Sequence, residues 1–319
     1  MLCNFNARWI AGVFIPLLLT ACSAPQMLAL RSAPPAQLKP HTELTEVAYF
    51  PQDEYQCGPA SLAMVFQRAG LNIEPGQLKD SLYIPDKQGS LQVEMLAATR
   101  RHGLLAYQLQ PSLQDVLSEI SSGNPVVVLQ NLGLSWYPLW HYAVVIGYDL
   151  DNEEIILRSG SNRRLVLPMN TFENTWARSQ YWAMVALPPA AMPHTARPEN
   201  FIQSIAALEH SSPMTETWPA YAAAMQRWPD VLLSKIAAGN HAYNRGNLPM
   251  AEQIFLQATQ SHPASAAAFN NLAQTLSDQG KYDAALSAIH RALEIGGPLE
   301  PTMRKTLAEI ENKKRAALK

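Results

Sequence analysis

Several familiar functional signatures are absent from this sequence. Charged residues make up only 16% of the 319 residues and the formal net charge is −2, so the chain lacks the basic surface that nucleic-acid-binding proteins present. It contains no His-Glu-x-x-His motif and no glycine-rich loop that ends in Lys-Ser or Lys-Thr. The sequence therefore predicts no nucleic-acid partner, no metal ion and no other cofactor.

Cysteine is also scarce. Cys3 and Cys22 lie in the N-terminal segment, which leaves Cys57 as the only thiol in the rest of the chain. A single thiol cannot close an internal disulfide or build a cysteine-rich zinc site. Cys57 is therefore a small structural side chain, a partner for another molecule, or a reactive group.

The first residues are typical of an export signal. Residues 1–8 contain one basic residue, Arg8, and no acid, and residues 9–19 are apolar but interrupted by Pro16. That run is shorter than the roughly 20 residues of a membrane-spanning helix and fits the apolar core of a signal peptide. We expect a cleaved signal peptide over residues 1–22.

The end of this segment, Leu19-Thr20-Ala21-Cys22, resembles the lipobox of bacterial lipoproteins. The resemblance implies cleavage before Cys22 and attachment of lipid to its sulfur. The alternative is an ordinary cleaved signal with an incidental cysteine. Ser23, and not an aspartate, follows the cysteine; by resemblance to Gram-negative sorting, this favours an outer-membrane lipoprotein that faces the periplasm.

The composition changes twice after this point. Residues 23–42 are rich in Pro and Ala and have no periodicity, so the sequence predicts a semi-extended tether. Residues 43–190 then show a helical pattern at 60–69, followed by strand patterns that include 125–130 and a hairpin across 142–157. Early helices and later hairpins predict an α+β domain with a mostly antiparallel sheet.

The residues that suggest chemistry lie at the start of that first helix and of one later strand. In Gln-Asp-Glu-Tyr-Gln-Cys-Gly-Pro (52–59), Pro59 suits the first helical turn, so Cys57 lies where free amides and the helix dipole are expected to lower its pKa. The side-chain amide of Gln52 could stabilise an oxyanion together with the Cys57 N–H. His141 opens a strong strand, where its imidazole could take the thiol proton.

Together, Gln-x-x-x-Gln-Cys-Gly-Pro-Ala-Ser and the later His-Tyr-Ala-Val-Val-Ile-Gly-Tyr-Asp resemble the bacteriocin-processing (double-glycine leader) cysteine peptidases, whose fold is papain-like. The likeness runs from Val47 to Leu187. It implies that Cys57 is the nucleophile, His141 the general base and acid, and Gln52 the oxyanion donor. In the transporter-linked members the glutamine stands one residue further from the cysteine than Gln52 does here.

The resemblance also implies an aspartate that orients the imidazole, and this sequence has no carboxylate at that place. Folding the hairpin about its turn places His141 opposite Gly160. The orienting group is then expected from one of four residues: Arg158, Ser159, Ser161 or Asn162. We choose Ser159; the alternative is a Cys-His dyad with no third member.

Beyond the proline-rich linker the strand pattern ends and a 34-residue period begins, as between Gly246 and Gly280. The pattern Gly-x-aromatic/Leu-x-x-Ala, with a proline at the repeat end, resembles tetratricopeptide repeats. The expected units are two clear repeats at 232–265 and 266–299, a degenerate repeat at 198–231 and a capping helix at 301–319. We expect an all-α docking domain over residues 198–319; the alternative is a plain helical bundle.

The sequence thus predicts an α+β papain-like cysteine peptidase domain followed by an all-α tetratricopeptide-repeat domain, anchored in the cell envelope by lipid on Cys22. Its substrate would be a peptide or protein, and the repeats would bind a protein partner. The missing carboxylate leaves an alternative, a catalytically inactive peptidase-like scaffold that only binds peptide. Acyl transfer to an amine on the same fold is a third possibility.

Overall fold

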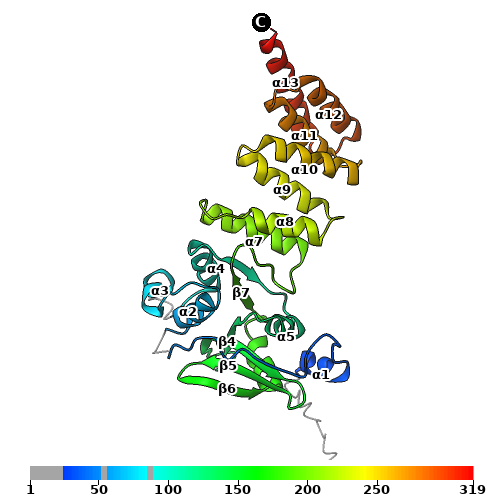
Figure 1. The fold of residues 1–319 in the computed structure, drawn as a ribbon. Helices are drawn as coiled ribbons and strands as arrows, with labels where there is room; N and C mark the ends of the chain where they lie inside the picture. The colour runs from blue at the N-terminus through cyan, green and yellow to red at the C-terminus, as the bar shows by residue number, and fades with distance from the viewer. Residues whose placement is uncertain (1–23, 52–55, 85–88, 319) are drawn as a thin grey trace, which may run out of the picture.

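The computed structural model describes residues 24–51, 56–84 and 89–318 (Figure 1). The predicted signal peptide with Cys22, and the predicted oxyanion residue Gln52, lie outside the described residues. The chain forms an α+β domain and a column of helices that leads away from it, with the C-terminus at the far end (Figure 1).

One antiparallel sheet forms the centre of the α+β domain. Its strands are β1 (His41–Glu43), β2 (Leu105–Gln108), β3 (Val126–Asn131), β4 (Trp140–Asp149), β5 (Glu154–Ser159), β6 (Asn162–Pro168) and β7 (Ala183–Leu187). The strand order is β2-β7-β3-β4-β5-β6, and β1 pairs with the last three residues of β4. Strands β3 and β7 are buried throughout their length, because helices cover the sheet.

Five helices of this domain pack on or beside the sheet. They are α2 (Cys57–Arg68), α3 (Pro75–Leu82), α4 (Gln92–Arg101), α5 (Leu113–Ser121) and α6 (Met169–Ala177). Helix α2 packs against β3, β4 and β7, whereas α6 packs against β3, β5 and β6. The predicted α+β class with an antiparallel sheet is confirmed.

A helix stands where the sequence predicted a tether. Helix α1 (Pro25–Ser32) docks on the α+β domain, with Met27 buried. The buried carboxylate of Glu173 accepts hydrogen bonds from the amides of Gln26 and Met27 at 3.0 and 2.7 Å, and so satisfies first-turn donors that the helix cannot. The semi-extended tether predicted for residues 23–42 is therefore wrong over this helix, because a carboxylate 146 residues away fixes the segment.

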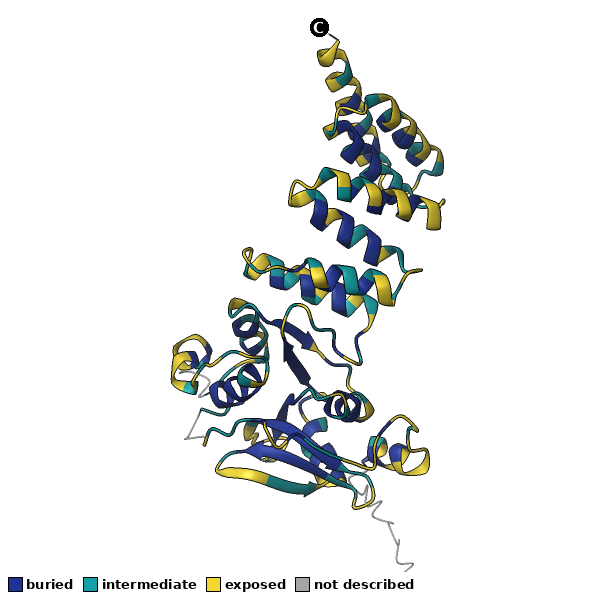
Figure 2. Ribbon diagram, viewed as in Figure 1, coloured by how far each residue is buried: buried dark blue, intermediate teal, exposed yellow. Residues whose placement is uncertain are grey.

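The C-terminal region is entirely helical in the part of the chain described. Its helices are α7 (Pro198–Ser211), α8 (Trp218–Arg227), α9 (Leu232–Asn244), α10 (Leu248–Ser261), α11 (Ala266–Asp278), α12 (Tyr282–Ile295) and α13 (Glu300–Ala317). From α9 onward each helix packs against the next, with small buried residues on the inner faces (Figure 2). Gly239 permits one close approach, since a Cβ there would lie 2.4 Å from the ring of Phe255. The predicted all-α class is confirmed.

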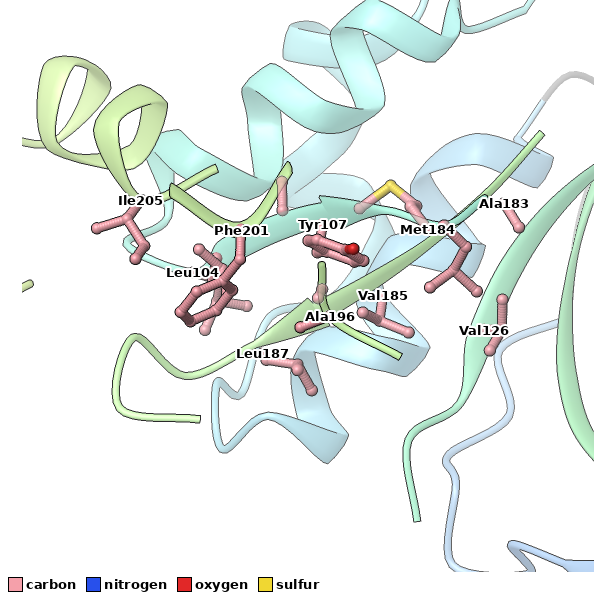
Figure 3. Packing of buried hydrophobic residues seen from close by; sticks show 14 of the residues in the cluster. Leu104, Tyr107, Val126, Ala183, Met184, Val185, Leu187, Ala196, Phe201 and Ile205 are labelled. Carbon is pink, nitrogen blue, oxygen red and sulfur yellow. The ribbon is translucent and has the colours of Figure 1, made fainter. Parts of the chain in front are cut away.

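Helix α7 joins the two regions through an apolar seam. Phe201 and Ile205 are fully buried beside Leu104 and Tyr107 of the α+β domain (Figure 3). The Tyr107 hydroxyl accepts a hydrogen bond from the amide of Arg197 at 3.0 Å, just before α7 begins. Burying a side chain such as Phe201 contributes roughly 1.5–3 kcal/mol, so the first helix of the repeat region is firmly attached.

None of the helices in the described ranges has the length and apolar character required to cross a membrane.

Candidate active site

Cys57 is the first residue of α2, the helix that lies against the middle of the sheet. The first intrahelical bond runs from the amide of Ala60 to the carbonyl of Gln56 at 3.0 Å, so the amides of Cys57 and Gly58 are not used within the helix. Gly58 is required beside the thiol, because a Cβ there would lie 2.4 Å from the Oγ of Ser90. The close packing of α2 therefore fixes where the sulfur lies.

Burial determines the ionisation of this thiol. Desolvation raises the pKa of Cys57 and outweighs the backbone amides of Tyr142, Gly58 and Cys57 itself, which favour the thiolate. The lowered pKa predicted from the helix start is therefore wrong for this arrangement, because the sulfur is withdrawn from water. The resting side chain at neutral pH is a thiol.

Strand β4 carries His141 and, one residue later, a backbone amide that reaches the thiol. His141 is the second residue of that strand, and the amide of the following residue, Tyr142, acts on the Cys57 sulfur. Burial lowers the pKa of His141, and no charged group of the described residues offsets this effect. The imidazole is therefore neutral at pH 7. Within the residues that the structure describes, the imidazole makes its hydrogen bond to Ser159 and makes none to the Cys57 sulfur.

A serine holds the imidazole. The Nε2 atom of His141 lies 2.9 Å from the Oγ of Ser159, so Ser159 is the residue among the four considered that contacts the ring. In the tautomer with a proton on Nε2, the ring donates to Ser159 and Nδ1 is left as a base. The hydroxyl fixes the ring but cannot balance the charge of an imidazolium.

The β4–β5 hairpin explains why this serine is within reach. Val144 lies opposite Arg158, beyond a β-bulge that shifts the register. Continuing this register by one pair places Ser159, the last residue of β5, opposite Ala143, two residues after His141. Ser159 is then a diagonal neighbour on the same face of the strand pair, a position from which side chains still meet.

Arg158, an alternative partner for the imidazole, has a different role. Its buried guanidinium donates to the carbonyl oxygens of Thr45 and Val47 at 3.1 and 3.0 Å. The hydroxyl of Tyr49 donates to the carbonyl of Gly160 at 3.1 Å. These bonds fasten the segment that leads to α2 onto the turn that follows β5, so both halves of the site share one support.

Tyr142 is a residue of the site that the sequence analysis missed. Its hydroxyl donates to the carbonyl of Ser90 at 3.1 Å, and its ring meets Trp182 edge-on with the ring centroids 5.7 Å apart. Burial, and then the charge on Cys57, raise the pKa of Tyr142, so it remains a phenol that can donate. The tyrosine directly after the histidine was the only sequence signal for this residue.

The loop between β3 and β4 leads directly into His141 and carries exposed apolar side chains. They are Leu132, Leu134, Trp136, Tyr137, Leu139 and Trp140. The Oδ1 atom of Asn131 accepts hydrogen bonds from the amides of Gly133 and Leu139, both at 2.9 Å, and the guanidinium of Arg178 donates to the Asn131 carbonyl at 3.0 Å. The loop is thus a braced hairpin, and the approach to the site is apolar.

Of the four predicted catalytic residues, the structure brings His141 and Ser159 into contact, and it places the amide of the residue after His141 against the sulfur of Cys57. The fourth, Gln52, lies outside the described residues, so its prediction as the oxyanion donor stays a prediction. Within residues 24–51, 56–84 and 89–318, no group of three or more His, Cys, Asp or Glu side chains is arranged to hold a metal ion. The chemistry that the arrangement offers is that of a thiol beside a neutral base.

Comparison with known proteins assigns both regions. Residues 44–184 match the model of the Peptidase_C39 like family, and residues 265–296 match a tetratricopeptide repeat model. No curated protein matches the chain.

Two solved structures are similar to the α+β part. A C39-like peptidase from Bacillus anthracis is 18% identical, with 47% of this chain and 98% of that chain covered and a TM-score of 0.40. The peptidase domain of Streptococcus ComA, a bifunctional ABC transporter of a quorum-sensing pathway, is 21% identical, with 45% and 99% covered and a TM-score of 0.38. The family models thus liken the α+β domain to the Peptidase_C39 like family and one stretch of the helical region to a tetratricopeptide repeat.

Proposed function

We propose that the α+β domain is an active cysteine peptidase in which His141 is the general base for Cys57. The observation that supports this most directly is the hydrogen bond between His141 and Ser159. The residue after His141 in β4, Tyr142, directs its backbone amide at the Cys57 sulfur. A neutral imidazole held by its Nε2 atom presents Nδ1 as a proton acceptor. That state is the one a base needs before the reaction starts.

The reaction begins from a neutral pair. His141 takes the thiol proton as the sulfur attacks the peptide carbonyl, and the amide of Cys57 stabilises the oxyanion together with the predicted donor Gln52. The imidazolium then gives its proton to the leaving amine, which leaves an acyl-enzyme on the sulfur. Water, activated by the same imidazole, releases the acid and restores the thiol.

A comparison of protein termini tests the proposal. Cells that carry the wild-type chain or Cys57→Ala are compared by proteomics of the cell envelope, and the purified proteins are incubated with a peptide library. We expect termini and cleavage products that depend on both Cys57 and His141. Identical sets of termini in the two strains, together with an uncut library, would count against proteolysis.

A catalytically inactive peptide-binding domain is the second candidate. Two observations favour it: burial raises the pKa of the Cys57 thiol, and among the residues that the structure describes no carboxylate acts on the imidazole of His141. A small thiol-reactive probe separates the two. In a peptidase, the probe labels Cys57 rapidly and in a pH-dependent way, and His141→Ala slows that labelling. In a binder, labelling of Cys57 is slow, and His141→Ala does not change its rate.

We further propose that lipid on Cys22 anchors the protein in the cell envelope, facing the periplasm, and that the repeats bind a protein partner. The support is the Leu-Thr-Ala-Cys motif at residues 19–22 and the repeat match. Growth with an alkyne analogue of palmitate tests the anchor. The wild-type chain should carry the label, and Cys22→Ala should remain unlabelled and unprocessed.

A further inference from the structure

A polar cavity of about 430 Å³ lies where the α+β domain meets the repeat region, away from Cys57. Helix α4 forms one wall, strand β2 and the turn after it form the floor, and one face of α7 forms the other wall. Its polar lining residues are Arg100, Gln108, Gln110, Asn200, Gln203 and Ser204. The lining contains one cation and no carboxylate.

Arg100 is a charge without a counter-charge. Its Nε atom is buried and has no hydrogen-bond partner, and no ion pair joins its guanidinium to a described acid. The next residue, Arg101, is exposed and pairs with Glu94 at 3.9 Å. The buried Arg158 donates to backbone carbonyls. Arg100 is half-buried, and burying its Nε–H without an acceptor costs free energy, which an anion in the cavity would offset by accepting from the guanidinium.

The floor of the cavity is the free edge of the sheet. Strand β2 lies at one end of the strand order, and among the described strands its partner is β7 alone. The amide of Leu109 donates to Ala183 in β7, so alternation along the strand directs the backbone groups of Ala106 and Gln108 away from β7. Both residues line the cavity. An extended peptide can pair with groups presented in this way.

The cavity ends at the apolar seam, where Phe201 of α7 lies beside Leu104, the residue before β2 (Figure 3). A strand added along β2 cannot continue past this contact. The edge therefore suits the end of a chain better than its middle, and the unmatched cation suits a chain end that carries a negative charge.

We propose that this cavity binds the C-terminal carboxylate of an extended peptide, with the peptide backbone paired to the edge of β2 and the carboxylate paired to the guanidinium of Arg100. The amide side chains of Gln108 and Asn200 are placed to bond the last peptide groups. The site is separate from the thiol, and a bound peptide would contact both the α+β domain and α7 of the repeat region.

Binding of a defined peptide tests the proposal. The probe is the blocked peptide acetyl-Thr-Val-Thr-Val with a free carboxylate, titrated calorimetrically into the full chain carrying Cys57→Ala so that it cannot be cleaved. We expect binding, about ten-fold or more weaker for the C-terminal amide of the same peptide. A third peptide, acetyl-Thr-Val-Glu-Val-amide, separates the two sources of a carboxylate, and it should bind no better than the plain amide.

Two matched variants locate the site. Arg100→Gln should weaken binding of the acid about ten-fold or more and leave the amide peptide unchanged, whereas Arg101→Gln should change neither. If Arg100 only supports the fold, Arg100→Gln will lower the melting temperature of the unliganded chain; we expect an equal or higher one, because an uncompensated charge is removed. Failure of the acid to bind, or equal binding by Arg100→Gln, overturns the proposal whether or not the thiol is catalytic.

Discussion

The two regions of this molecule are held together over very different distances along the chain. In the α+β domain, side-chain hydrogen bonds join Arg158 to a carbonyl 113 residues away and Tyr49 to one 111 residues away. In the repeat region, the bonds that join neighbouring helices span far less: 31 residues from Asn271 to Asn240, and 35 from Lys313 to Asp278. Each repeat therefore depends on its neighbours, whereas the peptidase site depends on the whole domain.

This difference predicts how far the structural effect of a single substitution should extend in each region. The segment before α2, the hairpin that carries Ser159 and the strand that carries His141 come together only when the sheet has formed. A destabilising substitution in any of these three segments should therefore disturb the position of the Cys57 thiol. A destabilising substitution in α13 should disturb only α11 and α12, the helices that α13 packs against.

The largest effect is expected at the base itself. His141→Ala removes the proton acceptor, so we expect kcat/KM for peptide cleavage to fall about 10³-fold or more. The matched control is His262→Ala, which changes a half-buried histidine of the repeat region that bonds the carbonyl of Asp230 at 3.0 Å. Retained cleavage in His141→Ala, or an equal loss in the control, would contradict the assignment of the base.

The next effect is on stability. Arg158→Met leaves the carbonyls of Thr45 and Val47 without their buried donor, so the free energy of unfolding should fall by about 3 kcal/mol, and activity should fall with it. The control is Arg304→Met in α13, whose exposed pair with Glu300 should contribute less than about 0.5 kcal/mol. Urea unfolding followed by circular dichroism measures both, and equal losses would remove the contrast between the regions.

The same contrast explains what the sequence could predict. The repeats follow from a 34-residue period, because their contacts are local and recur. The contact between His141 and Ser159 was also accessible, since a hairpin can be counted from its turn, and that count differs from the observed register by one residue only.

Properties that depend on distant parts of the chain were not accessible. The segment 25–32 reads as a Pro/Ala-rich tether, but Glu173 converts its start into a docked helix. The pKa of Cys57 was predicted in the wrong direction, because a helix start is visible in the sequence while the burial of its first side chain is not. The bracing by Arg158 was missed for the same reason, since its acceptors lie more than 100 residues earlier.

A carboxylate placed at the serine gives a smaller but more specific effect. In the wild type, burial holds the pKa of His141 below 6.5, so the acid limb of kcat/KM should lie below pH 6.5, and activity is lost as the base becomes protonated. Ser159→Asp stabilises the imidazolium and should move this limb upward by about one to two pH units. Ser159→Ala should lower kcat about ten-fold without that movement.

The direction of the shift distinguishes two resting states. If the thiol and imidazole are both neutral, the acid limb reports the imidazole and follows the new charge upward. If they form a thiolate-imidazolium pair, the limb reports the thiol and moves little. An unmoved limb in Ser159→Asp would therefore show that substrate-free enzyme already holds the ion pair, against the raised pKa of the Cys57 thiol.

The smallest effect is expected at the far end of the repeat region. Lys314 of α13 pairs with Asp283, whose side chain is 91% exposed, so solvent screens most of the attraction. Lys314→Met should change the free energy of unfolding by less than about 0.5 kcal/mol and should leave peptide cleavage unchanged. Amide hydrogen exchange shows which helices are affected. We expect exchange faster than in the wild type in α12 and α13 alone. Altered exchange in β4 or β5 would mean that the repeat column communicates with the thiol through α7, and the two regions would then have to be treated as one cooperative unit.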